Sequence, residues 1–200
     1  MDIAIFTAAQ RVTCKDIFDF YGKDHQTVKA CEELGELVAA AARRALPPDG
    51  RDSIADFIEE SADVLIMLQQ LFPDLSADML PKKRWDDRWT LVVNDATLMT
   101  AVLQQNENAD EFILRLFAAN AVSSILFAVF STRRADALFE KIEEKLNRQI
   151  ERMRAARAAK ESAAAPARDV LPDAVDSRAS DAAREFVAKC LRKDRSSYSE

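Results

Sequence analysis

The scarcity of residues that break helices constrains the fold of this chain more than any other feature of its sequence. Its 200 residues include only three glycines, Gly22, Gly35 and Gly50, and the stretch from Lys82 to Ala165 contains neither glycine nor proline. Alanine, leucine, glutamate and arginine, which dominate the sequence, are all strong helix formers. A β-sandwich or barrel would need turn residues that are absent here. The sequence therefore predicts an all-α fold built as a bundle of long helices.

Turn residues and capping residues predict where these helices begin and end. Pro47 and Pro48 stop the second helix, and Pro73 stops a third helix for which Asp52 or Ser53 is the expected N-cap. Residues 161–177 are rich in alanine, serine and proline, a composition typical of a flexible linker. We expect helices over residues 3–20, 24–45, 53–72, 87–105, 109–131, 135–160 and 179–193, a linker over 161–177, and two regions, a helical domain over 1–158 and a C-terminal region over 159–200.

Charge and cysteine content narrow the class of protein. The net charge is −6 and the isoelectric point is near 5.0, which argues against a surface that coats a nucleic-acid polymer. Cys14, Cys31 and Cys190 form no CxxC motif and no disulfide framework. The N-terminus lacks the features of a signal peptide, and the apolar run at 123–130 is too short to span a bilayer. We therefore expect a cytoplasmic protein without a membrane partner.

Two pairs of carboxylates stand on the predicted second and third helices. Glu33 and Glu36 lie three residues apart in CEELGELV, and Glu60 and Asp63 have the same spacing in IEESADVL. Residues with this spacing are neighbours on one face of a helix, so the two side chains of each pair can converge. The connection between these helices contains a Pro-Pro-Asp-Gly turn, so we expect antiparallel helices that bring the two pairs together.

The surroundings of these pairs argue against an ordinary solvated helix face. Residues 52–81 contain seven acidic residues and no lysine or arginine, whereas a solvated helix normally interleaves opposite charges. We therefore expect half-buried carboxylates without a lysine or arginine nearby, which need a compensating cation. Four carboxylates suit a hard divalent cation, Mg²⁺ or alternatively Mn²⁺. A di-iron bundle is a competing interpretation, but its usual Glu-x-x-His motifs are missing.

The acidic motif resembles that of a known enzyme family. Glu-Glu-x-x-Glu at residues 32–36, followed by Glu-x-x-Asp at 60–63, resembles the motif of the MazG-like, all-α nucleoside triphosphate pyrophosphohydrolases of the dimeric dUTPase/MazG superfamily. The resemblance covers about residues 23–72 and resumes at 139–153. It implies a Mg²⁺-dependent hydrolase that cleaves (deoxy)nucleoside triphosphates to a monophosphate and pyrophosphate, and so clears unwanted nucleotides. It also implies assembly as a homodimer or homotetramer.

The resemblance also implies a role for each polar residue of the motif. The four carboxylates of the two pairs would be the catalytic residues that hold Mg²⁺. Lys145 and Arg148 would bind the outer phosphates. Glu32 or Glu59 would orient the metal-binding side chains without binding the metal, or would act as the base for the attacking water.

One departure from the small family members leaves the interpretation open. An inserted helical pair, over about residues 73–134, separates the acidic helices from Lys145, and we expect it to form a substrate lid or a subunit interface. Within it, Trp85 and Trp89 are expected to pack between helices rather than stack on a base. The alternative function is a non-catalytic helical interaction protein whose acidic face docks a basic partner.

Overall fold

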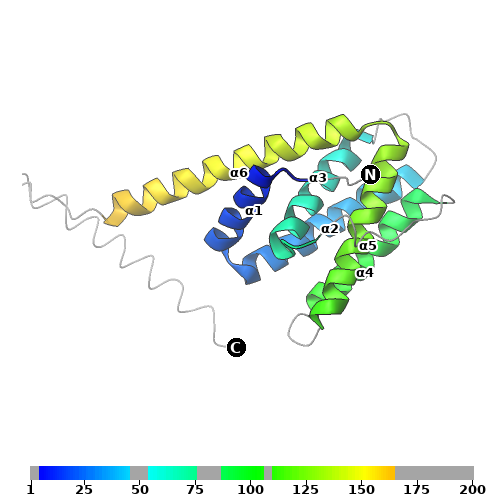
Figure 1. Cartoon of the computed structure of the whole chain (residues 1–200), viewed down its shortest axis with the longest axis horizontal. Helices are drawn as coiled ribbons and strands as arrows, with labels where there is room; N and C mark the ends of the chain where they lie inside the picture. The colour runs from blue at the N-terminus through cyan, green and yellow to red at the C-terminus, as the bar shows by residue number, and fades with distance from the viewer. Residues whose placement is uncertain (1–4, 46–53, 76–86, 106–109, 165–200) are drawn as a thin grey trace, which may run out of the picture. The chain divides into compact units, whose positions relative to one another are not determined.

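A computed structural model describes residues 5–45, 54–75, 87–105 and 110–164. Over these residues the chain forms six α-helices and no β-strand, which confirms the all-α class. The chain divides into two compact units, Met1–Ala159 and Lys160–Glu200. The helices are α1 (Ala8–Tyr21), α2 (Lys23–Ala45), α3 (Ile54–Leu71), α4 (Arg88–Gln104), α5 (Glu111–Ser131) and α6 (Ala135–Ala164) (Figure 1).

Local capping chemistry sets the bounds of α1. The Thr7 hydroxyl accepts a hydrogen bond from the backbone N–H of Gln10 at 3.2 Å, and the Gln10 side chain accepts one from the Thr7 N–H at 2.9 Å. This capping box satisfies two N–H groups that would otherwise lack helical partners, so α1 begins at Ala8 and not at residue 3 as predicted. Gly22, with φ of +84°, ends the helix because glycine adopts such angles without a steric penalty.

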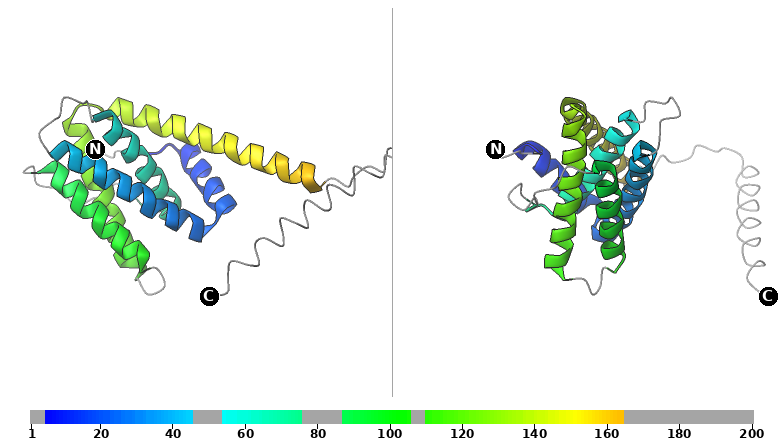
Figure 2. Two further views of the ribbon diagram at one scale, coloured as in Figure 1. Left: turned by 180° about the vertical axis from the view of Figure 1, so that it is seen from behind. Right: turned by 90° about the vertical axis from the view of Figure 1, so that its right-hand side faces the viewer.

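Helix α2 is central to the core of the first unit. It packs against α3 on one side and α4 on another, while α1 packs against both α2 and α3 (Figures 1 and 2). Leu34, Leu37 and Ala41 recur at helical spacing and are fully buried, as the apolar stripe of α2 predicts. Helix α6 adds Leu138, Ile142 and further apolar side chains to the same core.

The predicted insertion contains α4 and α5, and these helices complete the core. Trp89, near the start of α4, is 8% exposed and meets the Phe57 ring edge-on at 5.0 Å between centroids. The guanidinium groups of Arg44 and Arg88 lie 5.2 and 5.1 Å from the Trp89 ring. Trp89 therefore packs between helices, whereas Trp85 lies outside the described residues.

Helix α5 is more apolar than its sequence neighbours. In the described part of the chain it is the one helix long and apolar enough to cross a membrane, and its apolar stretch extends beyond residues 123–130. Of the 18-residue window that meets this test, 56% is buried inside the structure, and core helices of water-soluble proteins pass the same test. Phe112 and Leu116 remain exposed, whereas Ile125 and Val129 are buried.

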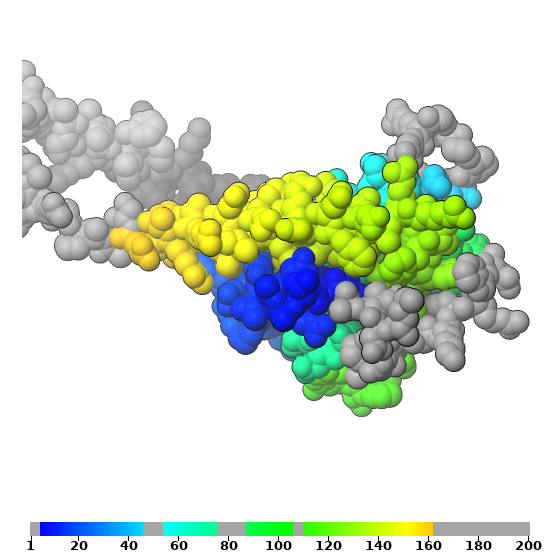
Figure 3. All heavy atoms as spheres, turned by 45° about the horizontal axis from the view of Figure 1, so that its top comes forward, coloured from blue at the N-terminus to red at the C-terminus, as the bar shows by residue number. Residues whose placement is uncertain are grey.

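Helix α6 is longer than predicted. It continues to Ala164, so residues 161–164, predicted as linker, are helical. Figure 3 shows α6 against α1, and the guanidinium of Arg157 lies 5.5 Å from the Phe20 ring at this contact. The remaining linker, the predicted helix over 179–193 and the expected N-caps at 52 and 53 lie outside the described residues.

Candidate metal centre

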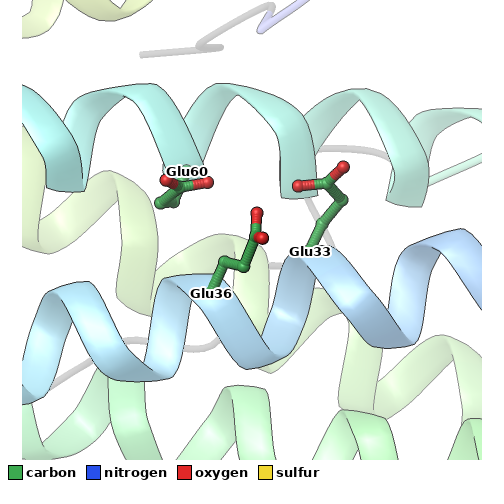
Figure 4. A group of neighbouring side chains, drawn as sticks. All are labelled: Glu33, Glu36 and Glu60. Carbon is green, nitrogen blue, oxygen red and sulfur yellow. The ribbon is translucent and has the colours of Figure 1, made fainter.

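Helices α2 and α3 bring three carboxylates to one point. Glu33 and Glu36 extend from α2, Glu60 extends from α3, and the three side chains lie in the space between the helices (Figure 4). One carboxylate oxygen from each residue lies within 4.8 Å of the others. We refer to Glu33, Glu36 and Glu60 as the acidic cluster.

The acidic cluster lies at the edge of the core, between protein and solvent. Glu33 is 7% exposed, Glu60 is half-buried, and Glu36 is exposed. Leu34 and Leu37, which neighbour Glu33 and Glu36 on α2, are fully buried and fix the rotation of this helix. The cluster therefore has one carboxylate, Glu33, anchored in the protein interior and another, Glu36, exposed to solvent.

The raised pKa values of Glu33 and Glu60 show that it is unfavourable for the cluster to carry three negative charges. Burial, followed by the charges of Glu36 and Asp63, raises the pKa of Glu60 to about 7, although Lys145 opposes the rise. Burial also raises the pKa of Glu33, against the opposing effect of Lys29 and with a further contribution from Glu36. A divalent cation would relieve this repulsion, and hard oxygen donors of this kind fit Mg²⁺ or Mn²⁺.

Asp63, the fourth predicted ligand, lies one turn beyond Glu60 and has a partner of its own. Its side chain is 19% exposed, and its carboxylate accepts a hydrogen bond from the Lys145 ammonium. Burial raises the pKa of Asp63, although Lys145 acts in the opposite direction. Its charge also contributes to the raised pKa of Glu60. Asp63 is therefore electrostatically coupled to the acidic cluster, and its role as a metal ligand stays a prediction.

Lys145 enters the site from α6 and is itself buried, with 7% exposure. Besides Asp63 it pairs with Glu59, whose carboxylate lies 3.2 Å from the Lys145 nitrogen. A buried lysine needs such partners because an isolated buried charge is costly. The expectation that these carboxylates lack a nearby cation is therefore wrong for Asp63, because the folded chain brings in a lysine from a distant helix.

Lys29 is a second cation that the sequence argument overlooked. Its ammonium lies 2.7 Å from the Glu33 carboxylate and 3.0 Å from that of Glu32. The signal was present in the sequence, since residues spaced i,i+3 and i,i+4 are neighbours on a helix. Lys29 compensates part of the charge at Glu33, whereas among the described residues Glu36 and Glu60 form no ion pair, and Lys145 acts on Glu60 only through its charge.

The other predicted residues, Glu32, Glu59 and Arg148, lie on α2, α3 and α6. Arg148 lies about one helical turn beyond Lys145 on α6. Its side chain is about half exposed and pairs with Glu144 at 3.4 Å. Glu32 and Glu59 each precede a cluster residue in sequence, and each is held by a lysine, Glu32 by Lys29 and Glu59 by Lys145. The phosphate-binding and base roles of these residues stay predictions.

Comparison with known proteins found no relative of this chain. No family model matches the chain, and neither curated protein sequences nor solved structures gave a match. The functional argument therefore depends on the residues of this chain and on their geometry.

Proposed function

We propose that this protein is a Mg²⁺-dependent nucleoside triphosphate pyrophosphohydrolase with a MazG-like helical bundle. The observation that carries the proposal is the acidic cluster, three carboxylates from two helices with ligand oxygens within 4.8 Å of one another. Lys145 on α6 pairs with Asp63, and Arg148 follows it three residues later on the same helix, so both are candidates to bind an anionic substrate. The resemblance of the acidic motif to the MazG-like family further supports a homodimer or homotetramer that removes excess or non-canonical nucleotides, and we propose that the protein is cytoplasmic.

The donor set fits the cation that this reaction needs. Glu33, Glu36 and Glu60 offer carboxylate oxygens only, which hard divalent cations prefer, and Asp63 is close enough to influence Glu60. When bound, Mg²⁺ would neutralise phosphate charge and make the α-phosphorus more electrophilic.

The side chains on α6 would orient the phosphates. Lys145 carries three N–H donors, and its contacts with Asp63 and Glu59 leave one for a phosphate oxygen. Arg148 can exchange its contact with Glu144, which is solvent-exposed and 3.4 Å long, for a bidentate contact with phosphate. Together they would hold the outer phosphates against the cluster.

The bond changes follow from the product pair. An oxygen of water forms a bond to the α-phosphorus, and the bond from that phosphorus to the α,β-bridging oxygen breaks, so pyrophosphate leaves. A carboxylate takes the proton that the water loses, and Glu59 and Glu32 are the candidates because each adjoins the cluster. The second product is the nucleoside monophosphate.

A substrate panel with two variants tests the proposal. We expect release of pyrophosphate from at least one (deoxy)nucleoside triphosphate in Mg²⁺ and none in EDTA. Glu36→Gln should lower kcat at least about a hundredfold with an unchanged helical CD spectrum, because it removes a ligand without removing volume. Glu151→Gln, an exposed glutamate on α6, serves as the matched control and should keep full activity.

Two results would count against this function. Full activity in Glu36→Gln would show that the acidic cluster is not the catalytic site. A folded protein that is silent across the panel and gains no thermal stability from Mg²⁺ would instead favour an acidic docking face, which has no need of a tightly bound cation.

A further inference from the structure

A small pocket lies apart from the acidic cluster, where the start of α2 meets the end of α3, the end of α4 and the start of α5. Its volume is about 330 Å³, at the lower end of the range for small-molecule sites. Among its described lining residues none belongs to the acidic cluster. The nearest lining residue along α2, Thr27, precedes Glu33 by six residues, a rise of roughly 9 Å. The pocket is therefore a separate candidate site.

Apolar side chains from three parts of the bundle form much of the lining of this pocket. Phe72 and Leu103 are buried in the core, and Leu71 and Leu114 are partly buried and pack against it. An apolar group of a ligand would lose contact with water against these side chains, which is favourable. The pocket therefore suits a ligand with an aliphatic or aromatic part.

Thr27 supplies a polar group that lacks a partner within the protein. Its side chain lines the pocket and is 8% exposed, yet its hydroxyl has no hydrogen-bond partner in the described part of the chain. By contrast, the hydroxyls of Thr97 and Thr100 on α4 each donate to the carbonyl oxygen four residues back in their own helix, at 2.7 and 2.9 Å. Buried polar groups normally have a partner because leaving one unpaired is costly. The Thr27 hydroxyl is therefore available to a ligand in the pocket.

Two charges of opposite sign line the pocket from different helices. Lys23 on α2 forms no ion pair among the described residues. Glu111 on α5 accepts hydrogen bonds from Arg115 at 2.8 and 3.1 Å, and both end on Oε1, which leaves Oε2 available. One lysine and one glutamate give the lining no net charge, so it does not attract a polyanion such as a nucleotide. A small ligand that carries both charges fits this lining better.

We propose that this pocket binds an α-amino acid with an apolar side chain, in its zwitterionic form. The ligand carboxylate accepts hydrogen bonds from the Lys23 ammonium and the Thr27 hydroxyl, which lie one turn apart on α2. The ligand ammonium donates to Oε2 of Glu111, and the ligand side chain packs against Phe72 and Leu103. This proposal does not rest on the proposed function, because the pocket and the acidic cluster use different residues.

Titration calorimetry of the full chain in EDTA with L-leucine and with L-phenylalanine tests the proposal. We expect at least one of them to bind with a dissociation constant of about 1 mM or lower. The N-acetyl derivative of the amino acid that binds lacks the ammonium, and its amide lacks the carboxylate. Each derivative should bind at least about tenfold more weakly, because a charged hydrogen bond is lost. Glycine should also bind at least about tenfold more weakly, because it has no apolar side chain.

Two variants locate the bound amino acid. Lys23→Met removes an exposed charge, and Thr27→Val removes the unpaired hydroxyl while it keeps the branched shape. Each should weaken amino-acid binding by about fivefold or more and leave the helical CD spectrum unchanged. Lys15→Met, an exposed lysine on α1, and Thr100→Val, whose hydroxyl has a partner in its own helix, are the matched controls and should bind as wild type does.

Three results would overturn the proposal. One is the absence of binding by both amino acids to the folded wild type. Another is equal binding of the amino acid, its N-acetyl derivative and its amide. The third is unchanged affinity in both Lys23→Met and Thr27→Val, because the amino acid would then bind elsewhere. The proposed function would stand or fall separately, on pyrophosphate release and on the Glu36→Gln variant.

Discussion

Replacing Glu60 with glutamine should stabilise the metal-free protein. The pKa of this carboxyl rises from an ordinary 4.5 to about 7 in the folded chain, chiefly through burial and then through Glu36 and Asp63. Because the folded state holds the proton more tightly than the unfolded state, stability falls as pH rises through the window from 4.5 to about 7, and the full cost is present above it. Glutamine has nearly the same shape and no charge, so Glu60→Gln removes this cost.

The expected size of this effect follows from the pKa values. Without solvent screening the rise in pKa would correspond to about 3 kcal/mol. Glu60 is only half-buried, so screening reduces the expected gain to about 1–2 kcal/mol. For a chain of this size that gain raises the melting temperature by about 2–8 °C.

Thermal unfolding followed by CD in EDTA measures the effect. At about pH 8 Glu60→Gln should melt above wild type, and at about pH 4.5 the two should agree, since the glutamate is then largely protonated when folded. Mg²⁺ should raise the melting temperature of the wild type and have little effect on the variant. Glu151→Gln, at an exposed position on α6, should show none of these changes. A melting temperature below wild type at the higher pH, or a gain of the same size at both pH values, would refute the electrostatic reasoning.

Three further predictions concern the cation and the core. Lys29→Met should tighten Mn²⁺ binding by about threefold to tenfold, because a competing positive charge 2.7 Å from Glu33 is lost; weaker Mn²⁺ binding, measured by EPR titration, would contradict this. In the wild type, Mn²⁺ affinity should fall as pH drops below about 7, since Glu60 then retains its proton, and a pH-independent isotherm would be inconsistent with its raised pKa. Met99→Ala on α4 should cost about 2–5 kcal/mol in urea unfolding because this side chain is fully buried, whereas a loss below 1 kcal/mol would mean that α4 is separable from the core.

Much of the helical architecture was predictable because local signals determine it. The absence of glycine and proline between Lys82 and Ala165 excludes most alternatives, and apolar spacing locates the stripe of α2. The start of α1 was missed because the Thr7–Gln10 capping box outweighs the apolar pattern before it. The end of α6 was missed because its alanine-rich extension is as compatible with a helix as with a linker.

The acidic cluster was predictable in part. The i,i+3 spacing of Glu33 and Glu36, with the Pro-Pro-Asp-Gly sequence between the two helices, sufficed to predict that Glu60 would meet them. The pairing of Lys145 with Asp63 could not be predicted as a contact, because it depends on how α6 packs along the bundle. A groove lined by Glu59 on α3 and by Glu140 and Glu144 on α6 could not be predicted either, because its walls come from segments far apart in the sequence.

The position of the oxygen taken from water tests the central claim most directly. Hydrolysis of a preferred triphosphate in water enriched in ¹⁸O, with Mg²⁺ present, can be followed by ³¹P NMR and mass spectrometry. Attack at the α-phosphorus predicts one ¹⁸O atom in the nucleoside monophosphate, none in pyrophosphate, and no reaction with Glu36→Gln. Label in released phosphate or pyrophosphate, or unchanged turnover in that variant, would contradict a pyrophosphohydrolase built on the acidic cluster.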